Sequence, residues 1–471
     1  MAEGGSPVGA VATSSGTALN AAKQAAHSAE TAASPEKCSP APPGIGSAFF
    51  SRDFRLYQLA RLLVILGAEA QSVAVAWQVY AITHSAFKLG LTGLMLFAPG
   101  IVFILAAGHV ADRYDRRAII LICYSLQAIC TLALLEFALH GISHVWPIYA
   151  ILFGIGMGRA FSGPAASALL PSLVPAEHFV NAVTWGSIVF QIANIAGPTV
   201  GGFLFVLPLA GTMQPWDGAA IVYAFTLLTL VAFLTLVGSM RTKPVRKINN
   251  AFNLETMLAG FRYVWQTKLL LGSISLDLFA VLLGGATALL PIYATDILHA
   301  GPRGLGLLRA MPSLGALAVS VIMTVRPIQR NAGKKMLSCV AIFGAATIVF
   351  GLSRTMWVSL VALIVVGASD MVSVVIRGSI LQLAAPPEMR GRVSAVNWLF
   401  IGASNEFGEF ESGTTAKWWG AVRSVVIGGI GSLAVTALSS VIFPRLRNAD
   451  ALTAESLLGS SVQQSTAEPV D

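Results

Sequence analysis

Charged side chains interrupt several long apolar stretches of this sequence, and their chemistry is the first feature to explain. A charge at the centre of a lipid bilayer costs at least about 2.5–3.5 kcal/mol, so such a residue is a functional candidate by default. A carboxyl group there can bind and release a proton, and an arginine nearby stabilises its charged form. The candidates for handling protons or a substrate are Glu69, Arg159, Asp277, Asp370, Arg377, Asn405 and Glu406.

Each candidate also has a purely structural interpretation. Glu69 could hydrogen-bond a neighbouring helix, and Arg159 could do no more than neutralise Glu69. Asp370 and Arg377 lie two turns apart on one helix face and could pair with each other, while Asp277 could lie close enough to a membrane surface to be solvated. Arg309, Glu409 and Glu411 are weaker candidates of the same kind.

The amino-acid composition indicates that membrane-spanning segments position these residues. Of 471 residues, 55% are hydrophobic and 11% are charged, against about 25% charged in an average soluble protein. These values exclude a soluble enzyme, a nucleic-acid-binding protein and a disordered scaffold. The basic residues lie between apolar segments, so the pI near 9.5 reflects membrane topology rather than a nucleic-acid partner.

Twelve apolar segments follow from residue 55 onward, each near the roughly 20 residues that span a bilayer. Because backbone groups in lipid must pair internally, we expect every segment to be a helix and the fold to be an all-α membrane protein. The segments are about 56–82, 87–110, 117–139, 146–171, 180–208, 218–240, 269–295, 303–325, 334–352, 356–384, 393–416 and 419–443.

The distribution of Lys and Arg predicts the topology. Most basic residues in the short connections fall on the side that holds the N-terminus, and only Lys88, Arg303, Arg354 and Lys417 fall in connections on the other side. The excess of positive charge marks the cytoplasmic side. We therefore expect both termini in the cytoplasm and a multi-pass protein of the cell (inner) membrane.

The longest connection between apolar segments divides the chain into two bundles of six helices. It contains a basic stretch and then apolar residues at helical spacing, which is typical of an amphipathic helix on the membrane surface. Pro175-Ala-Glu177 and Pro386-Pro-Glu388 lie at the same place in the two halves, as a parallel repeat would require. The expected parts are a disordered tail (1–48), an N-terminal bundle (49–240), a linker (241–268), a C-terminal bundle (269–444) and a second tail (445–471).

The connection between the second and third segments carries a specific motif. It contains Gly108, then Asp112-Arg113 four residues later, then two more arginines at Arg116 and Arg117. This pattern resembles the loop signature of the major facilitator superfamily, with Asp115 where that family usually has Gly. The resemblance implies two six-helix bundles. A short loop with one carboxylate and several arginines can form a charge-assisted network, and we expect this network to be a latch that locks one half against the other in one conformation.

Two further motifs resemble this superfamily. The fifth segment contains Gly197, Pro198, Gly201 and Gly202, which resembles the Gly-Pro-x-x-Gly-Gly motif of its exporters; generic close packing of small residues is the alternative. The segment starting at Arg159 resembles the Arg-x-x-Gln-Gly motif associated with proton coupling, but Ser162 replaces Gln. The stretch from Phe54 to Tyr80, the Arg159 segment and the stretch from Pro387 to Val393 together resemble bacterial exporters similar to the enterobactin exporter.

The resemblance implies export of a small amphipathic molecule, of siderophore or drug type, by alternating access and proton antiport. The sequence contains no Gly-x-x-x-x-Gly-Lys-Ser/Thr loop, so the energy would come from a gradient rather than ATP. A lysophospholipid flippase of the same fold is the nearest alternative, and a non-transporting membrane protein is a more distant one. We expect a monomer that is not an enzyme, with no cofactor or metal and with the lipid bilayer, protons and a small molecule as partners.

The motif with Asp112 gives a first test. Asp112→Asn should abolish most transport while leaving membrane insertion intact, because the latch loses its carboxylate. Substitution of Arg330, the residue at the corresponding place in the second half, should matter less. Transport and surface expression measured together in cells would check this, and full transport by Asp112→Asn would refute the latch.

Overall fold

The computed structural model describes residues 47–103, 106–107, 110, 113–141, 144–175, 178–207, 217–241, 254–326, 328, 330–386 and 389–449. These residues form helices, and no strand occurs among them. The long helices of the first half are α2 (Arg52–Thr83), α3 (Ala86–Val102), α5 (Arg116–His140), α6 (Trp146–Leu169), α7 (Phe179–Leu204) and α8 (Asp217–Gly238). Those of the second half are α10 (Lys268–Gly284), α12 (Gly301–Val325), α13 (Ala332–Leu352), α14 (Met356–Ala384), α15 (Arg390–Trp419) and α16 (Ala421–Ile442).

Shorter helices connect or precede these elements. The helix α9 (Leu254–Gln266) lies between the halves in the sequence, and α17 (Pro444–Arg447) follows α16. The remaining short elements are η1 (Ser47–Phe50), η2 (Leu170–Ser172), η4 (Thr287–Leu289), α11 (Leu290–Ile292) and the π-helix η5 (Tyr293–Ile297).

Within the described residues, nine helices are long and apolar enough to cross a membrane. One of the nine is the segment Lys268–Ile297, which joins α10 to η4, α11 and η5. The long helices outside the nine are α3, which has 17 residues, and α6 and α15, which carry charged candidates. Arg159 lies on α6, whereas Glu406 and Glu409 lie on α15. The described part of the chain is thus helical, with several helices long and apolar enough to cross a membrane.

Local sequence signals begin and end several of these helices. Ser51 caps α2 by accepting from the amide of Phe54, and Asp115 caps α5 by accepting from the amide of Arg117 at 3.2 Å. Gly141 and Gly420 follow α5 and α15 with φ of 81° and 84°, where a side chain would be strained. The caps matter because a helix end has backbone groups without partners in the helix.

The segment predicted as one helix over 269–295 is broken, so that prediction was wrong in detail. The helix α10 ends at Gly284, and η4, α11 and η5 follow in place of a continuous α-helix. Adjacent glycines at 284 and 285 disfavour helix, and Pro291 lacks the amide hydrogen that a helix interior needs. The break exposes the side chain of Thr287 to the centre of the molecule.

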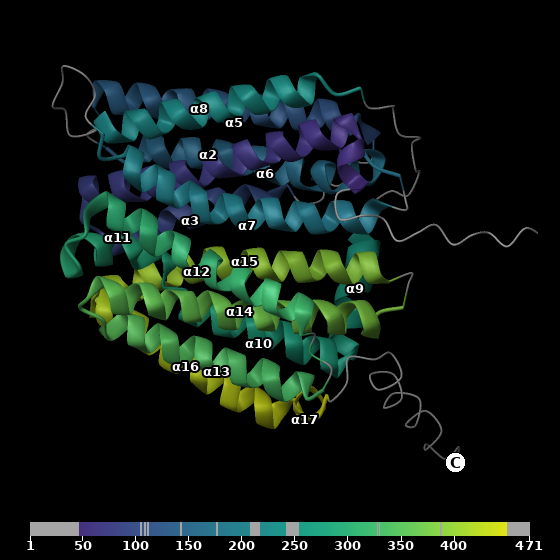
Figure 1. Cartoon of the computed structure of the whole chain (residues 1–471). Helices are drawn as coiled ribbons and strands as arrows, with labels where there is room; N and C mark the ends of the chain where they lie inside the picture. The colour runs from purple at the N-terminus through teal and green to yellow at the C-terminus, as the bar shows by residue number, and fades with distance from the viewer. Residues whose placement is uncertain are drawn as a thin grey trace, which may run out of the picture. The chain divides into compact units, whose positions relative to one another are not determined.

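The helices of each half pack mainly on one another (Figure 1). In the first half α2 contacts α7 and α8, while α5 contacts α6 and α8. In the second half α14 contacts α12 and α13, while α10 contacts α15 and α16. The halves meet along two helix pairs, α3 with α15 and α7 with α12.

The end of the bundle where α2 finishes (Thr83) and α3 begins (Ala86) is called the distal end below, and the end where α2 begins is the proximal end. Apolar residues of both halves, such as Tyr223 and Tyr293, share one core that includes the distal end. The proximal ends have two separate cores, one for each half. Close packing of side chains therefore joins the halves more extensively at the distal end.

Glycines permit the closest approach between the helices. A Cβ placed on Gly367 of α14 would collide with the carbonyl oxygen of Pro312 on α12, and one on Gly315 of α12 would collide with that of Ile364. The α12–α14 contact therefore depends on the absence of side chains at these positions.

Gly367→Ala should destabilise the protein by about 1–3 kcal/mol, because the added methyl group has no space beside Pro312. Gly378→Ala is the matched control on the same helix, since nothing lies within 4 Å of the position that its methyl group would take. The control should be neutral or more stable by up to about 1 kcal/mol through helix propensity. Thermal unfolding in detergent measures both, and equal melting temperatures would contradict the packing argument.

Candidate functional site

A charged cavity lies between the two halves. Its volume is about 190 Å³, and its lining comes from α2, α3, α6, η4, α12 and α15. Five charged residues line it: Glu69, Arg159, Arg309, Glu406 and Glu409. The first two come from one half and the last three from the other, so side chains from both halves face a common space.

These charges are open to a ligand or to water. Within the described part of the chain, no ion pair with an N–O distance of 4.0 Å or less joins any two of the five. Arg159 is exposed, and the other four are half-buried. Burial of unpaired charges is costly, so the site requires water, protons or a charged substrate.

The rest of the lining is mostly apolar. Val75, Leu89, Leu96 and Ile155 contribute hydrocarbon surface, and Ser72 and Thr92 are among the hydroxyl groups. A cavity that combines apolar side chains with convergent polar groups is typical of sites for small molecules. The arrangement can bind an amphipathic molecule and present a charge to its polar part.

The glycines of the predicted motif in the fifth segment pack α7 against α2, the helix that carries Glu69 of the cavity. Gly197 of α7 packs against Glu69, whose Cβ would lie 2.5 Å from a Cβ on the glycine. Gly201 packs on Ala70 of α2 in the same way, because a Cβ placed on Gly201 would lie 2.7 Å from Cα of Ala70. Gly202 faces the other half, where a Cβ would lie 3.0 Å from Cα of Gly306. The motif thus joins α7 both to the cavity helix α2 and to α12, with Pro198 inside α7.

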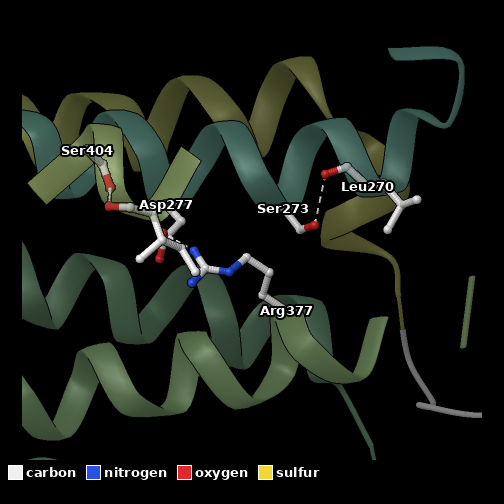
Figure 2. A network of polar contacts seen from close by, with 6 residues as sticks. Leu270, Ser273, Asp277, Arg377 and Ser404 are labelled. Atoms are coloured by element: carbon white, nitrogen blue, oxygen red, sulfur yellow. Dashed lines mark hydrogen bonds and ion pairs between the residues drawn. The ribbon is translucent and has the colours of Figure 1, made fainter. Parts of the chain in front are cut away.

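The remaining predicted residues do not reach this cavity. Asp277, Asp370, Arg377 and Asn405 line a second cavity of about 190 Å³, inside the second half. Asp277 and Arg377 form an ion pair there (Figure 2), with exposed side-chain fractions of 7% and 3%. The predicted set of seven therefore separates into two sites.

Two sequence interpretations are wrong at this second cavity. Arg377 pairs with Asp277 of α10 and not with Asp370 of its own helix, because α10 brings a carboxylate directly opposite it. Asp277 is buried and not solvated near a membrane surface. The interpretation of Arg159 as a structural partner of Glu69 is likewise wrong, since no ion pair joins them in the described structure.

The predicted latch falls partly outside the described residues, which include neither Gly108 nor Asp112. Arg113 lies among them and is exposed. The guanidinium of Arg117 donates to the carbonyl oxygen of Gly238 on α8, and Arg116 also makes a contact. Asp115, which replaces the usual glycine, caps α5.

Sequence reasoning ranked two cavity residues too low and missed others. Arg309 and Glu409 stood only as weaker candidates, and Gly93 and Thr287 were not considered. A periodicity argument could have found Glu409, because it lies three residues after Glu406 on the same helix face. The described residues contain no group of three or more His, Cys, Asp or Glu side chains placed to hold a metal ion.

The buried pair provides a test of its role. Asp277→Asn should destabilise the protein by about 3–5 kcal/mol, because it leaves the Arg377 guanidinium buried without a counter-charge. The double variant Asp277→Asn, Arg377→Gln should recover most of this loss. Thermal unfolding in detergent measures both effects. If the single variant is as stable as the parent but does not transport, the pair acts in transport and not in folding.

Comparisons with known proteins agree with this architecture. The enterobactin exporter EntS of Citrobacter koseri is 26% identical over 389 residues, which cover 82% of this chain and 87% of that protein. A bacterial homologue of the human lysosomal transporter Spinster, in an inward-facing and occupied conformation, superposes with a TM-score of 0.65 at 15% identity. The superposition covers 84% of this chain and 98% of that protein's chain.

A D-xylose–proton symporter superposes with a TM-score of 0.63 at 15% identity, covering 83% of this chain and 98% of its own. The family model described as transmembrane secretion effector matches residues 47–468. With the loop signature, the helical fold and the cavity between its halves, this match means that the chain belongs to the transmembrane secretion effector family of major facilitator superfamily transporters, multi-pass proteins of the cell membrane.

Proposed function

We propose that this transporter exports a small amphipathic molecule, of siderophore or drug type, in exchange for protons. The observation that carries the proposal is the cavity between the halves, where three glutamates and two arginines face one space together with apolar side chains. The named activity of the relatives, enterobactin export, supports the substrate class. Siderophores and many drugs combine aromatic or apolar surface with polar groups, which matches such a lining.

The proposed topology has twelve membrane spans, six in each half, with both termini in the cytoplasm. It follows from the basic residues at the proximal end, such as Arg52, Arg55 and Arg445. The distal end then faces outward. The shared core near that end and the separate proximal cores fit a state in which the outer end is closed. Rocking of the halves would open each end in turn.

Proton exchange would use the unpaired carboxylates of the cavity. Glu69 on α2 is the first candidate for the carrier, with Arg159 on α6 across the same space. A movement that joins these two residues favours the charged carboxylate and releases the proton, and a movement that separates them favours proton binding. Substrate and proton would then compete for one site.

The test of this function is efflux from energised cells, and enterobactin and ethidium are suitable probes of the two substrate types. Efflux should stop when a protonophore collapses the gradient, and it should continue during ATP depletion while the gradient is clamped. Glu69→Gln mimics the protonated carboxyl group, so it should lose efflux against a gradient but keep exchange at equilibrium. Arg423→Gln, on α16 and outside the cavity lining, is the control and should keep both.

ATP-dependent efflux at zero gradient would contradict proton coupling. Accumulation against a gradient by Glu69→Gln would remove Glu69 as the carrier and make Glu406→Gln the next variant. If neither probe is exported, a comparison of secreted metabolites from cells with and without the protein identifies the substrate.

A further inference from the structure

The cavity inside the second half has room for one aromatic ring. Its volume is about 190 Å³, and a dry protein cavity of roughly 150 Å³ is enough to bind benzene. Phe343, Thr347 and Phe350 of α13 line this cavity at helical spacing, so they share one face of that helix. Leu363 and Val366 of α14 add hydrocarbon surface. The lining is therefore suited to a flat apolar group.

Packing around the cavity holds its two aromatic rings in place. The ring centroid of Phe350 lies 4.5 Å from that of Tyr293. A Cβ placed on Gly284 would lie 2.6 Å from Cε1 of Phe343, so the Phe343 ring rests directly against the backbone of α10. Rings that are fixed in this way can pack against a third ring, and their faces attract a cation.

Asp370 of α14 gives this cavity an uncompensated negative charge. Among the described residues, its carboxylate has neither an ion pair within 4.0 Å nor a hydrogen bond. Arg377, two turns along the same helix, pairs instead with Asp277 (Figure 2). The hydroxyl groups of Thr347 and Ser404 donate to carbonyl oxygens of their own helices, each at 2.9 Å. Because an unpaired carboxylate in an apolar space is costly, a cation that enters this cavity gains a strong partner.

The broken stretch after α10 separates this cavity from the one between the halves. Residues 284–286 line the second cavity, Ala288 lines the first, and Thr287 lines both. On α15 the consecutive residues Asn405 and Glu406 line the second and the first cavity, respectively. Positions 285 and 286 belong to no helix, so this part of the partition can shift without breaking a helical turn. The two cavities are therefore neighbours across a thin wall.

We propose that the second cavity binds an aromatic ring that carries a protonated amine, with the ammonium group on the carboxylate of Asp370 and the ring beside Phe343 and Phe350. A divalent metal ion fits less well, because it needs about six oxygen ligands and the lining is mainly hydrocarbon. The cavity is then a side compartment that takes one cationic aromatic group of a larger substrate. This part in transport rests on the proposed function, whereas the binding itself does not.

The test is equilibrium binding of 4-fluorobenzylamine to the full-length protein in detergent. Fluorine NMR follows the ligand, and empty micelles give the baseline. The neutral compound 4-fluorobenzyl alcohol has nearly the same shape and serves as the matched ligand. The amine should bind about tenfold more tightly than the alcohol, or better, because only the amine places a positive charge against the carboxylate.

Two variants separate the effect of charge from the effect of space. Asp370→Asn should weaken binding of the amine by about tenfold or more and leave binding of the alcohol unchanged. Val366→Phe should weaken binding of both ligands, because the larger side chain takes up part of the cavity. Glu411→Gln removes a carboxylate of α15 that lines neither cavity, so it is the matched control and should keep both affinities. Thermal unfolding of each variant distinguishes a loss of binding from a loss of folding.

The photoreactive analogue 4-azidobenzylamine locates the bound ligand. Labelled peptides should come from α13 or α14, and labels confined to α2, α3 or α6 would overturn the proposal by placing the amine between the halves. Equal binding of the amine and the alcohol would also overturn it, as would unchanged binding of the amine by Asp370→Asn. Binding requires no gradient, so amine binding without proton-driven efflux would refute the proposed function and leave this site. Proton-driven efflux without amine binding would refute this site alone.

Discussion

A charged side chain in an apolar bundle needs an opposite charge or access to water, and this constraint organises the structure. The protein meets it in two ways. Asp277 and Arg377 neutralise each other inside the second half, where both are almost fully buried. The five charges between the halves have no close ion-pair partner in the described structure and share a cavity instead. The ion pair satisfies both of its charges without a ligand, whereas the cavity charges need water, protons or a ligand in the cavity.

Close approach of helices at glycines decides where that cavity lies. Gly90 and Gly413 bring α3 against α15, and Gly202 and Gly306 bring α7 against α12. Both contacts lie toward the distal end, where apolar residues of the two halves also share one core. The hydroxyl group of Tyr80 on α2 adds a hydrogen bond to Asp296 of η5 across the same interface. The halves can separate more readily at the other end, where each has a core of its own.

The fold alone leaves the substrate open, since a D-xylose–proton symporter and a Spinster homologue superpose on this chain to a similar degree. The side chains of the cavity are the more informative feature. Three carboxylates and two guanidinium groups face a common space that also has apolar side chains in its wall. Such a site can bind a polar or charged part of a molecule through its charges and the rest by apolar contact.

The sequence by itself determined the class of protein. Apolar segments of membrane length must become helices in lipid, and the residues around Arg113 are specific enough to indicate the superfamily. It also picked out Glu69, Arg159 and Glu406, because an isolated charge in an apolar segment is conspicuous. These properties depend on local composition and spacing, which the sequence states directly.

Only the tertiary structure decided which charges meet. Asp370 and Arg377 share a helix face, yet Arg377 pairs with Asp277, because the register of α10 against α14 selects the partner. The break after Gly284 and the contact of Gly93 with two glutamates were likewise not evident from spacing. Helical periodicity determines which residues share a face, whereas the neighbour that this face meets depends on how separate helices pack. That packing arises from the shape of many side chains together, and no short stretch of sequence contains it.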